Sequence, residues 1–210
     1  MDGRPIQIGS YRHNVQDGRW VSYHPDGSLH GLFSLQAGRL HGLSVGRDRH
    51  SFSIARYVRG QKEGLSCEPL SSPPRGRMAG TYRHGRRHGA WVIDATSETV
   101  ISGRYVDGRR EGLWTSWGRS KTPTHETCYR HDRPHGPYRE WDARGKAHVA
   151  GQYVDGKRHG HWVHYKESDE GGPTLWYAEY RHGEAVASRS GPRPVARAWR
   201  GPLICAASAR

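Results

Sequence analysis

Residues 153–165 read YVDGKRHGHWVHY, and this stretch is the cleanest copy of a unit that recurs along most of the chain. Counted from its first residue, the unit has an aromatic residue at position 0, glycine at +3 and +7, and tryptophan at +9. The other copies begin at residues 11, 35, 57, 82, 105, 129 and, in part, 180. A period of this length is typical of proteins in which one small structural unit stacks on the next.

Position +3 indicates that each unit is a β-hairpin. It is glycine in every copy except at Asn14 and Asp132, and asparagine and aspartate are the non-glycine residues that best tolerate a positive φ. The Asp-Gly pairs at 107–108 and 155–156 are hairpin-turn dipeptides. We therefore expect a left-handed residue at +3, a polar loop, and a second strand that begins near the tryptophan. The residues expected to shape the turns are Gly85, Gly89, Gly108, Gly112, Asp132, Gly136, Gly156 and Gly160.

The pattern resembles the MORN-repeat variant family, in particular the bacterial YwqK-type antitoxins, whose repeat is similar to Y-x-x-G-x-x-x-G-x-W. The copies at 82–91, 105–114 and 153–162 match it in full. The copy that begins at Tyr11 differs only at Asn14, whereas the copies that begin at residues 35 and 57 have serine in place of tryptophan.

This resemblance covers roughly residues 8–187. It implies an all-β fold, a single elongated and twisted antiparallel sheet of about eight stacked β-hairpins. We expect a repeat domain at 1–187 and a basic, flexible tail at 188–210 that is dispensable for folding. The resemblance also implies an antitoxin or immunity role, in which the protein neutralises a toxin by direct binding. Because repeat scaffolds host many partners, the motif is specific for the fold rather than for the function.

Composition favours an acidic partner. The net charge is +13, and hydrophobic residues make up only 33% of the chain, below the roughly 45–50% of a typical globular domain. Tyrosine and tryptophan are abundant, at 11 and 8 residues. Aromatic side chains that cover one another on a sheet are therefore expected in place of an aliphatic core. A basic protein of this kind suits an acidic protein, a nucleic acid or an anionic membrane.

Basic residues at +4 and +5 are expected to project from one edge of the stacked hairpins. With the neighbouring tryptophans, the candidate partner-binding residues are Arg86, Arg87, Arg109, Arg110, Arg133, Lys157, Arg158, Trp91, Trp114 and Trp162. A protein partner would use the aromatic residues as a desolvated centre and the charges as a rim. A nucleic acid would instead bind through its phosphates. The alternative is that these basic residues lie at hairpin tips that are exposed to solvent and bind no partner.

No catalytic or metal-binding motif is present. His41, His88, His135 and His159 share position +6, but equivalent residues of successive hairpins lie roughly 10 Å apart, too far to share one ion. The chain has no GxSxG, HExxH or glycine-rich phosphate loop. We expect a protein that is not an enzyme, with no cofactor, no metal and no small-molecule substrate.

The cysteines and the N-terminus favour a cytoplasmic protein. Cys67, Cys128 and Cys205 are odd in number and far apart, so a disulfide framework is not expected and a reducing compartment fits better. The first residues have no apolar segment typical of a signal peptide. No apolar run approaches the length of a membrane span.

The function we expect is that of a non-catalytic, protein-binding repeat scaffold. Two alternatives stay open: a binder of anionic surfaces, either nucleic acid or phospholipid, and a structural scaffold in a larger assembly.

Overall fold

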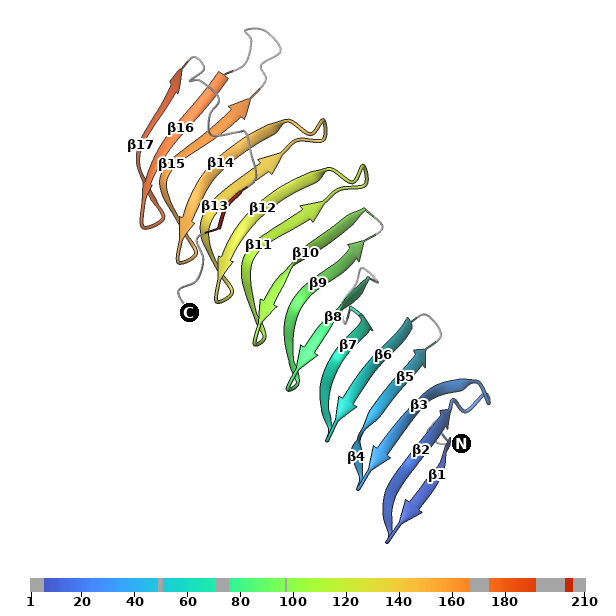
Figure 1. Cartoon of the computed structure of the whole chain (residues 1–210). Coiled ribbons are helices and arrows are strands. Elements are labelled where there is room, and N and C mark those ends of the chain that lie inside the picture. Colours follow the sequence, from blue (N-terminus) through green and yellow to red (C-terminus); the bar gives the residue numbers. More distant parts are fainter. Residues whose placement is uncertain are drawn as a thin grey trace. The chain divides into compact units, whose positions relative to one another are not determined.

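The structure is a computed structural model that describes residues 6–48, 51–70, 76–96, 98–166, 174–191 and 203–205. These residues form 17 strands and no helix. The strands belong to one sheet in which neighbours along the chain pair antiparallel (Figure 1). The predicted all-β fold of hairpin repeats is thus confirmed. Nothing in the described ranges is a helix long and apolar enough to cross a membrane.

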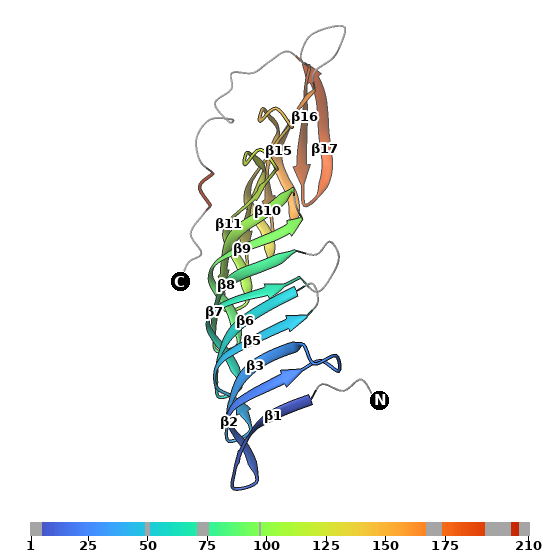
Figure 2. The ribbon, with the colours of Figure 1, turned by 90° about the vertical axis from the view of Figure 1, so that its right-hand side faces the viewer.

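The chain divides into two compact units, Met1–Thr96 (unit 1) and Ser97–Arg210 (unit 2). The sequence predicts a single repeat domain at 1–187. The strands of unit 1 are β1 (Ile6–Arg12), β2 (Val15–Tyr23), β3 (Leu29–Gln36), β4 (Arg39–Leu40), β5 (Gly42–Asp48), β6 (Ser51–Val58), β7 (Gln61–Pro69), β8 (Arg77–Arg83) and β9 (Arg86–Thr96). The strands of unit 2 are β10 (Thr99–Val106), β11 (Arg109–Trp117), β12 (Pro123–Arg130), β13 (Arg133–Trp141), β14 (Ala147–Val154), β15 (Lys157–Lys166), β16 (Thr174–Arg181) and β17 (Glu184–Gly191). Figure 2 shows that within each unit the hairpins follow one another in sequence order.

In each of the eight repeat copies, the turn that follows position 0 contains two residues with positive φ. In the β14–β15 hairpin these are Asp155 (48°) and Gly156 (85°), and in the β10–β11 hairpin Asp107 (48°) and Gly108 (91°). Two successive residues of this kind make the type I′ turn, whose twist matches that of the strands. The left-handed residue predicted at +3 is confirmed, including at Asp132 (69°). The predicted polar loop is wrong, because the second strand begins directly after the turn.

The glycine at +7 forms a β-bulge inside the second strand. Gly112 and Gly160 have φ values of 70° and 66°, and the register of each hairpin shifts opposite them. A bulge adds residues to one strand only. In the β8–β9 hairpin Thr81 pairs with His88, whereas the preceding Gly80 pairs with Trp91. The bulge therefore places the tryptophan at +9 opposite the residue at −2.

Every tryptophan at +9 packs on a glycine at −2. A Cβ atom added to these glycines would lie closer than 3.0 Å to the indole ring, so the ring rests directly on the neighbouring backbone. The pairs are Gly9 with Trp20, Gly80 with Trp91, Gly103 with Trp114, and Gly151 with Trp162. Where +9 is Ser66, the facing residue at −2 is Ala55. In this chain, every copy of the repeat that has tryptophan at +9 also has glycine at −2.

These tryptophans form the core on one side of the sheet, which we call the tryptophan face. The tyrosine at position 0 lies edge-on to the ring, as in the pair Tyr153 and Trp162 at 5.0 Å between centroids. The indole Nε1 of Trp162 donates to the carbonyl oxygen of Gln152 at 3.1 Å. Edge-to-face aromatic pairs of this kind add about 0.5–1.5 kcal/mol beyond the area they bury.

The first prediction concerns the turns. Replacing Gly108 by valine should lower the free energy of unfolding by about 1–2 kcal/mol, because a β-branched residue is strained at positive φ. The φ of Gly108 is 91°. Urea unfolding followed by tryptophan fluorescence measures the change. An unchanged midpoint would mean that residue 108 does not need the left-handed conformation.

Candidate protein-binding face

The three tryptophans predicted to contact a partner are buried. Trp91, Trp114 and Trp162 expose 1%, 5% and 0% of their surface. A side chain without exposed surface cannot touch a second protein while the sheet stays folded. The prediction that these residues form the centre of a binding surface is therefore wrong, because the glycine at −2 lets each ring settle into the core.

The predicted stripe of basic residues divides between the two faces of the sheet. Its members at +4 are exposed, namely Arg86, Arg109, Arg133 and Lys157. Its members at +5 stack on aromatic rings of the tryptophan face, with distances from the guanidinium carbon to the ring centroid of 5.1 Å for Arg87, 4.0 Å for Arg110 and 4.4 Å for Arg158. Successive residues of a strand point to opposite sides. The stripe is thus not one continuous surface.

In several hairpins the residue at +6 has a structural role at the tips. Its side chain accepts a hydrogen bond from a backbone N–H in the turn of the following hairpin: Glu111 from His131 at 3.0 Å, and His135 from Asp155 at 3.3 Å. Asp155 also pairs with Arg130 at 2.9 Å, and that hydrogen bond, with a smaller contribution from His135, lowers the pKa of Asp155. These hydrogen bonds and the Arg130–Asp155 ion pair therefore join neighbouring tips.

The other side of unit 1 carries a continuous row of apolar side chains. Val21 and Val92 follow Trp20 and Trp91 directly, so they point away from the tryptophan face. Each member of the row is the direct cross-strand partner of the next. The members of this apolar row are Ile8, Val21, Leu32, Val45, Ile54, Cys67, Ala79 and Val92.

Much of the apolar row lies open to solvent. Ile8, Leu32 and Val92 are exposed, and beside the row Leu43 and Leu65 expose 54% and 77% of their surface. Scattered exposed aliphatic residues are ordinary, but contiguous apolar patches on a protein surface are typical of sites that another molecule covers.

Exposed arginines flank the apolar row on both sides. Arg19 and Arg56 lie two residues from Val21 and Ile54 along their strands, and Arg47 and Arg77 lie two residues from Val45 and Ala79. Residues two apart on a strand point to the same side. An apolar centre with a basic rim results, and the partner that complements it has an apolar patch with an acidic rim.

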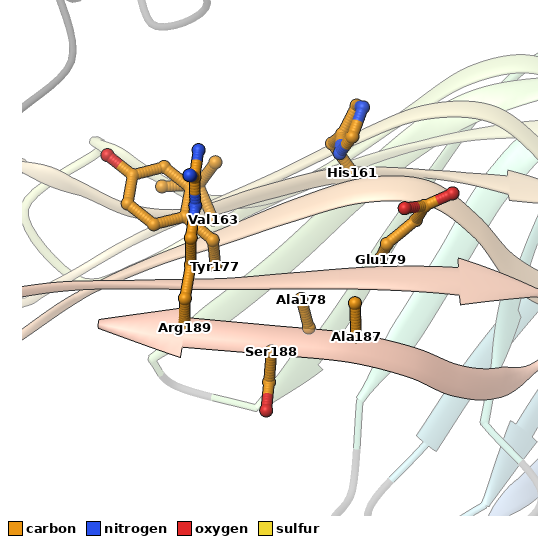
Figure 3. A pocket seen from close by; sticks show the side chains of 8 residues that line it. All are labelled: His161, Val163, Tyr177, Ala178, Glu179, Ala187, Ser188 and Arg189. Atoms are coloured by element: carbon orange, nitrogen blue, oxygen red, sulfur yellow. The ribbon is translucent and has the colours of Figure 1, made fainter. Parts of the chain in front are cut away.

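The corresponding row of unit 2 is interrupted by polar and charged residues, although it also contains the apolar pair Ala150 and Val163. Its paired members include Glu126 opposite Arg139, and Tyr177 opposite Arg189. Burial raises the pKa of Glu126 against the opposing effect of the Arg139 charge. Tyr177 and Arg189 line a hollow of about 530 Å³ together with Val163, and Figure 3 shows the three side chains on one side of the strands.

Part of the C-terminal segment lies on this side of unit 2. Leu203 lines a hollow with Val163, and Cys205 forms a disulfide with the buried Cys128. In Figure 2 residues 203–205 stand beside the strands of unit 2. The expectation of unpaired cysteines is therefore wrong for this pair, and Cys67 alone is free.

The predicted boundary at residue 187 falls inside β17, which stays paired with β16 as far as Gly191. The remainder of the predicted tail, apart from 203–205, lies outside the described residues.

The apolar row was missed in the sequence, although a signal for it exists. Its members occupy positions −3 and +10 of the four copies that begin at residues 11, 35, 57 and 82. In the later copies these positions are mixed, with polar or charged residues such as Glu126 and Arg139 next to the apolar pair Ala150 and Val163. Comparing these two positions along the chain shows that the unbroken apolar run is confined to the first four copies.

No protein-family model matches the chain, and no curated protein matches it. The proposed function therefore rests on the arrangement of the side chains.

Proposed function

We propose that the protein is a non-catalytic, protein-binding repeat scaffold, and that its partner docks on the apolar row of unit 1. The observation that carries this proposal is the unbroken cross-strand pairing of eight apolar side chains, from Ile8 to Val92, on a side of the sheet where several stay exposed. Burying such a row is favourable by about 25 cal/mol for each Å² removed from water.

A protein suits this face better than a nucleic acid does. Binding to a single-stranded nucleic acid needs cations for the phosphates and aromatic rings free to stack on bases. Here the candidate tryptophans are buried, and the stripe's arginines at +5 already lie on aromatic rings. The apolar row offers aliphatic surface instead, with Arg19, Arg47, Arg56 and Arg77 around it.

An antitoxin or immunity role is the specific form of this proposal. It is supported by the likeness of the repeat to the MORN-variant, YwqK-type sequence, with full matches at 82–91, 105–114 and 153–162. In this form the partner is a toxin that the protein neutralises by covering it. Binding of anionic surfaces, or a purely structural role in an assembly, would leave the apolar row without a specific occupant.

Pull-down from a lysate of the native host tests the proposal. The immobilised wild-type protein should retain one protein partner, and a variant with Leu32→Glu and Leu43→Glu should not. Both side chains are exposed, so the fold should tolerate the charges. The matched control is Val154→Glu, an exposed aliphatic residue of unit 2, which should retain the partner. Equal recovery on all three baits, or recovery abolished by nuclease, would contradict the proposal.

A further inference from the structure

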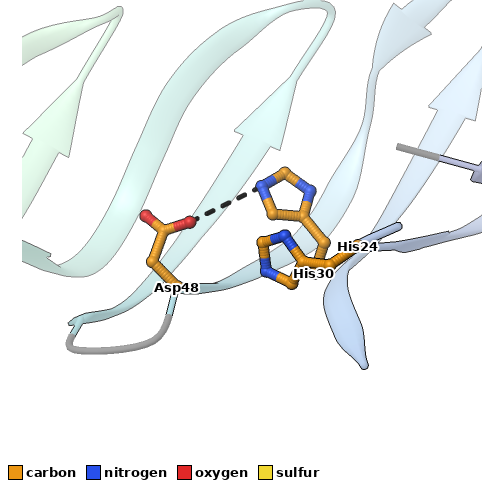
Figure 4. Close-up of side chains that lie close together, drawn as sticks. All are labelled: His24, His30 and Asp48. Carbon is orange, nitrogen blue, oxygen red and sulfur yellow. Dashed lines mark ion pairs between the residues drawn. The ribbon is translucent and has the colours of Figure 1, made fainter. Parts of the chain in front are cut away.

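Two histidines and one aspartate converge at one end of the strands of unit 1. His24 follows β2, His30 lies in β3, and Asp48 is the last residue of β5. Each offers one donor atom, and the three atoms lie within 4.8 Å of one another (Figure 4). Nitrogen from imidazole together with one carboxylate oxygen is a donor set that zinc and its neighbours among the divalent transition metals accept.

Both imidazole rings are already held by protein oxygen atoms. The Oγ of Ser22 lies 3.1 Å from Nδ1 of His30, which leaves Nε2 of that ring 3.7 Å from the Asp48 carboxylate. Nε2 of His24 lies 3.2 Å from the carbonyl oxygen of Arg47. Metal-binding histidines usually have their second ring nitrogen bonded in this way, which fixes the orientation of the ring. Ser22 is itself buried.

The spacing of the donors is compatible with a single ion. Three atoms that lie within 4.8 Å of one another all fall within about 2.8 Å of a common point, whereas zinc ligands lie about 2.0–2.2 Å from the metal. Each donor would therefore move by less than about 1 Å. By contrast, the histidines at +6 lie on different hairpins, and His135 is already bonded to Asp155 of the next tip. Asp48 is well exposed, and its other carboxylate oxygen, Oδ2, accepts a hydrogen bond from Ser51 Oγ at 3.2 Å.

We propose that His24, His30 and Asp48 bind one divalent transition-metal ion of the zinc type, with water in the remaining coordination positions. A hollow of about 300 Å³, lined by His24, Ser28 and Asp48 among others, gives the ion access. The bound ion would join the turn after β2 to the end of β5. The site does not involve the apolar row, so it stands or falls independently of the proposed function.

Calorimetric titration of the metal-free protein with zinc chloride tests this site. We expect one ion per chain at saturation of this site. His24→Ala and His30→Ala should each weaken its affinity by roughly a hundredfold, and Ser22→Ala by roughly tenfold, since residues that orient a ligand usually matter by 10–100-fold. The control is His13→Asn, an exposed turn histidine of the same unit with a φ of 50°, a conformation that asparagine tolerates.

Asp48→Asn provides a second variant that keeps the shape of the side chain while removing its charge, and it should also weaken binding. Far-UV circular dichroism of each variant establishes that the fold is retained. The site would be overturned if zinc bound equally well to wild type, His24→Ala and His30→Ala. It would also be overturned if His13→Asn lost as much affinity as those two, or if the wild type showed no saturable binding.

Discussion

Replacing Gly151 by alanine should lower the free energy of unfolding by about 3 kcal/mol, at the upper end of what overpacking a core costs. The added Cβ would lie closer than 3.0 Å to the ring of Trp162, and that ring exposes none of its surface. The backbone cannot retreat either, since β14 is paired on both sides, with β13 and β15. Urea unfolding of the variant and the wild type measures the loss.

A double-mutant cycle separates this clash from other effects. Trp162→Ser alone should cost about 3–5 kcal/mol, as removal of a buried tryptophan does. In that background Gly151→Ala should cost little, because the pair would then match Ala55 and Ser66 in unit 1. The control is Gly191→Ala, where an added Cβ meets nothing within 4 Å. If Gly151→Ala cost the same in both backgrounds, the packing of tryptophan on glycine would not be what requires glycine.

Loss of the Cys128–Cys205 disulfide should lower the stability of unit 2 by about 4.5 kcal/mol if its effect is to restrict the unfolded chain. The bond joins residues 77 positions apart, and the entropy of loop closure rises with the length of the loop. We therefore expect Cys205→Ser to unfold at lower urea concentration than the wild type, with the reduced wild type resembling the variant.

Cys67→Ser is the matched control, since Cys67 is free, and it should respond to reductant as the wild type does. Removing all residues after Ala187 should be more harmful than either change, because it deletes half of β17 as well as Cys205. This reverses the expectation that the tail is dispensable. Identical midpoints with and without reductant would show that the disulfide contributes nothing to stability.

The fold could be predicted because its turn residues are local signals. Asp-Gly at 107–108 and 155–156 predicts a type I′ hairpin without knowledge of any other part of the chain, and the period predicts that the hairpins stack. The burial of the tryptophans is harder to predict from the sequence than the turns are. A regular ladder would pair +7 with −2, and only the bulge at +7 brings Trp91 opposite Gly80. The sequence shows the glycine at +7 but not the resulting register.

The candidate site was missed for a related reason. The residues next to each tryptophan in these strands, such as Val21 and Val92, point to the opposite side of the sheet. The prediction was based on the aromatic residues and therefore selected the face on which they are buried. The disulfide had no local signal at all, because Cys128 and Cys205 are brought together by the path of the chain rather than by their spacing.

We propose that the apolar row of unit 1 is the surface that binds a protein. Titration of the captured partner against variants, at two salt concentrations, tests it most directly. We predict that Leu32→Glu weakens binding by about 2 kcal/mol or more, as loss of a central contact does. Arg109→Ala in unit 2 should cost less than about 1 kcal/mol, as exposed charges usually do. If the arginine variant lost most affinity, Leu32→Glu lost little, and binding vanished at the higher salt concentration, the account would be contradicted in favour of an anionic ligand.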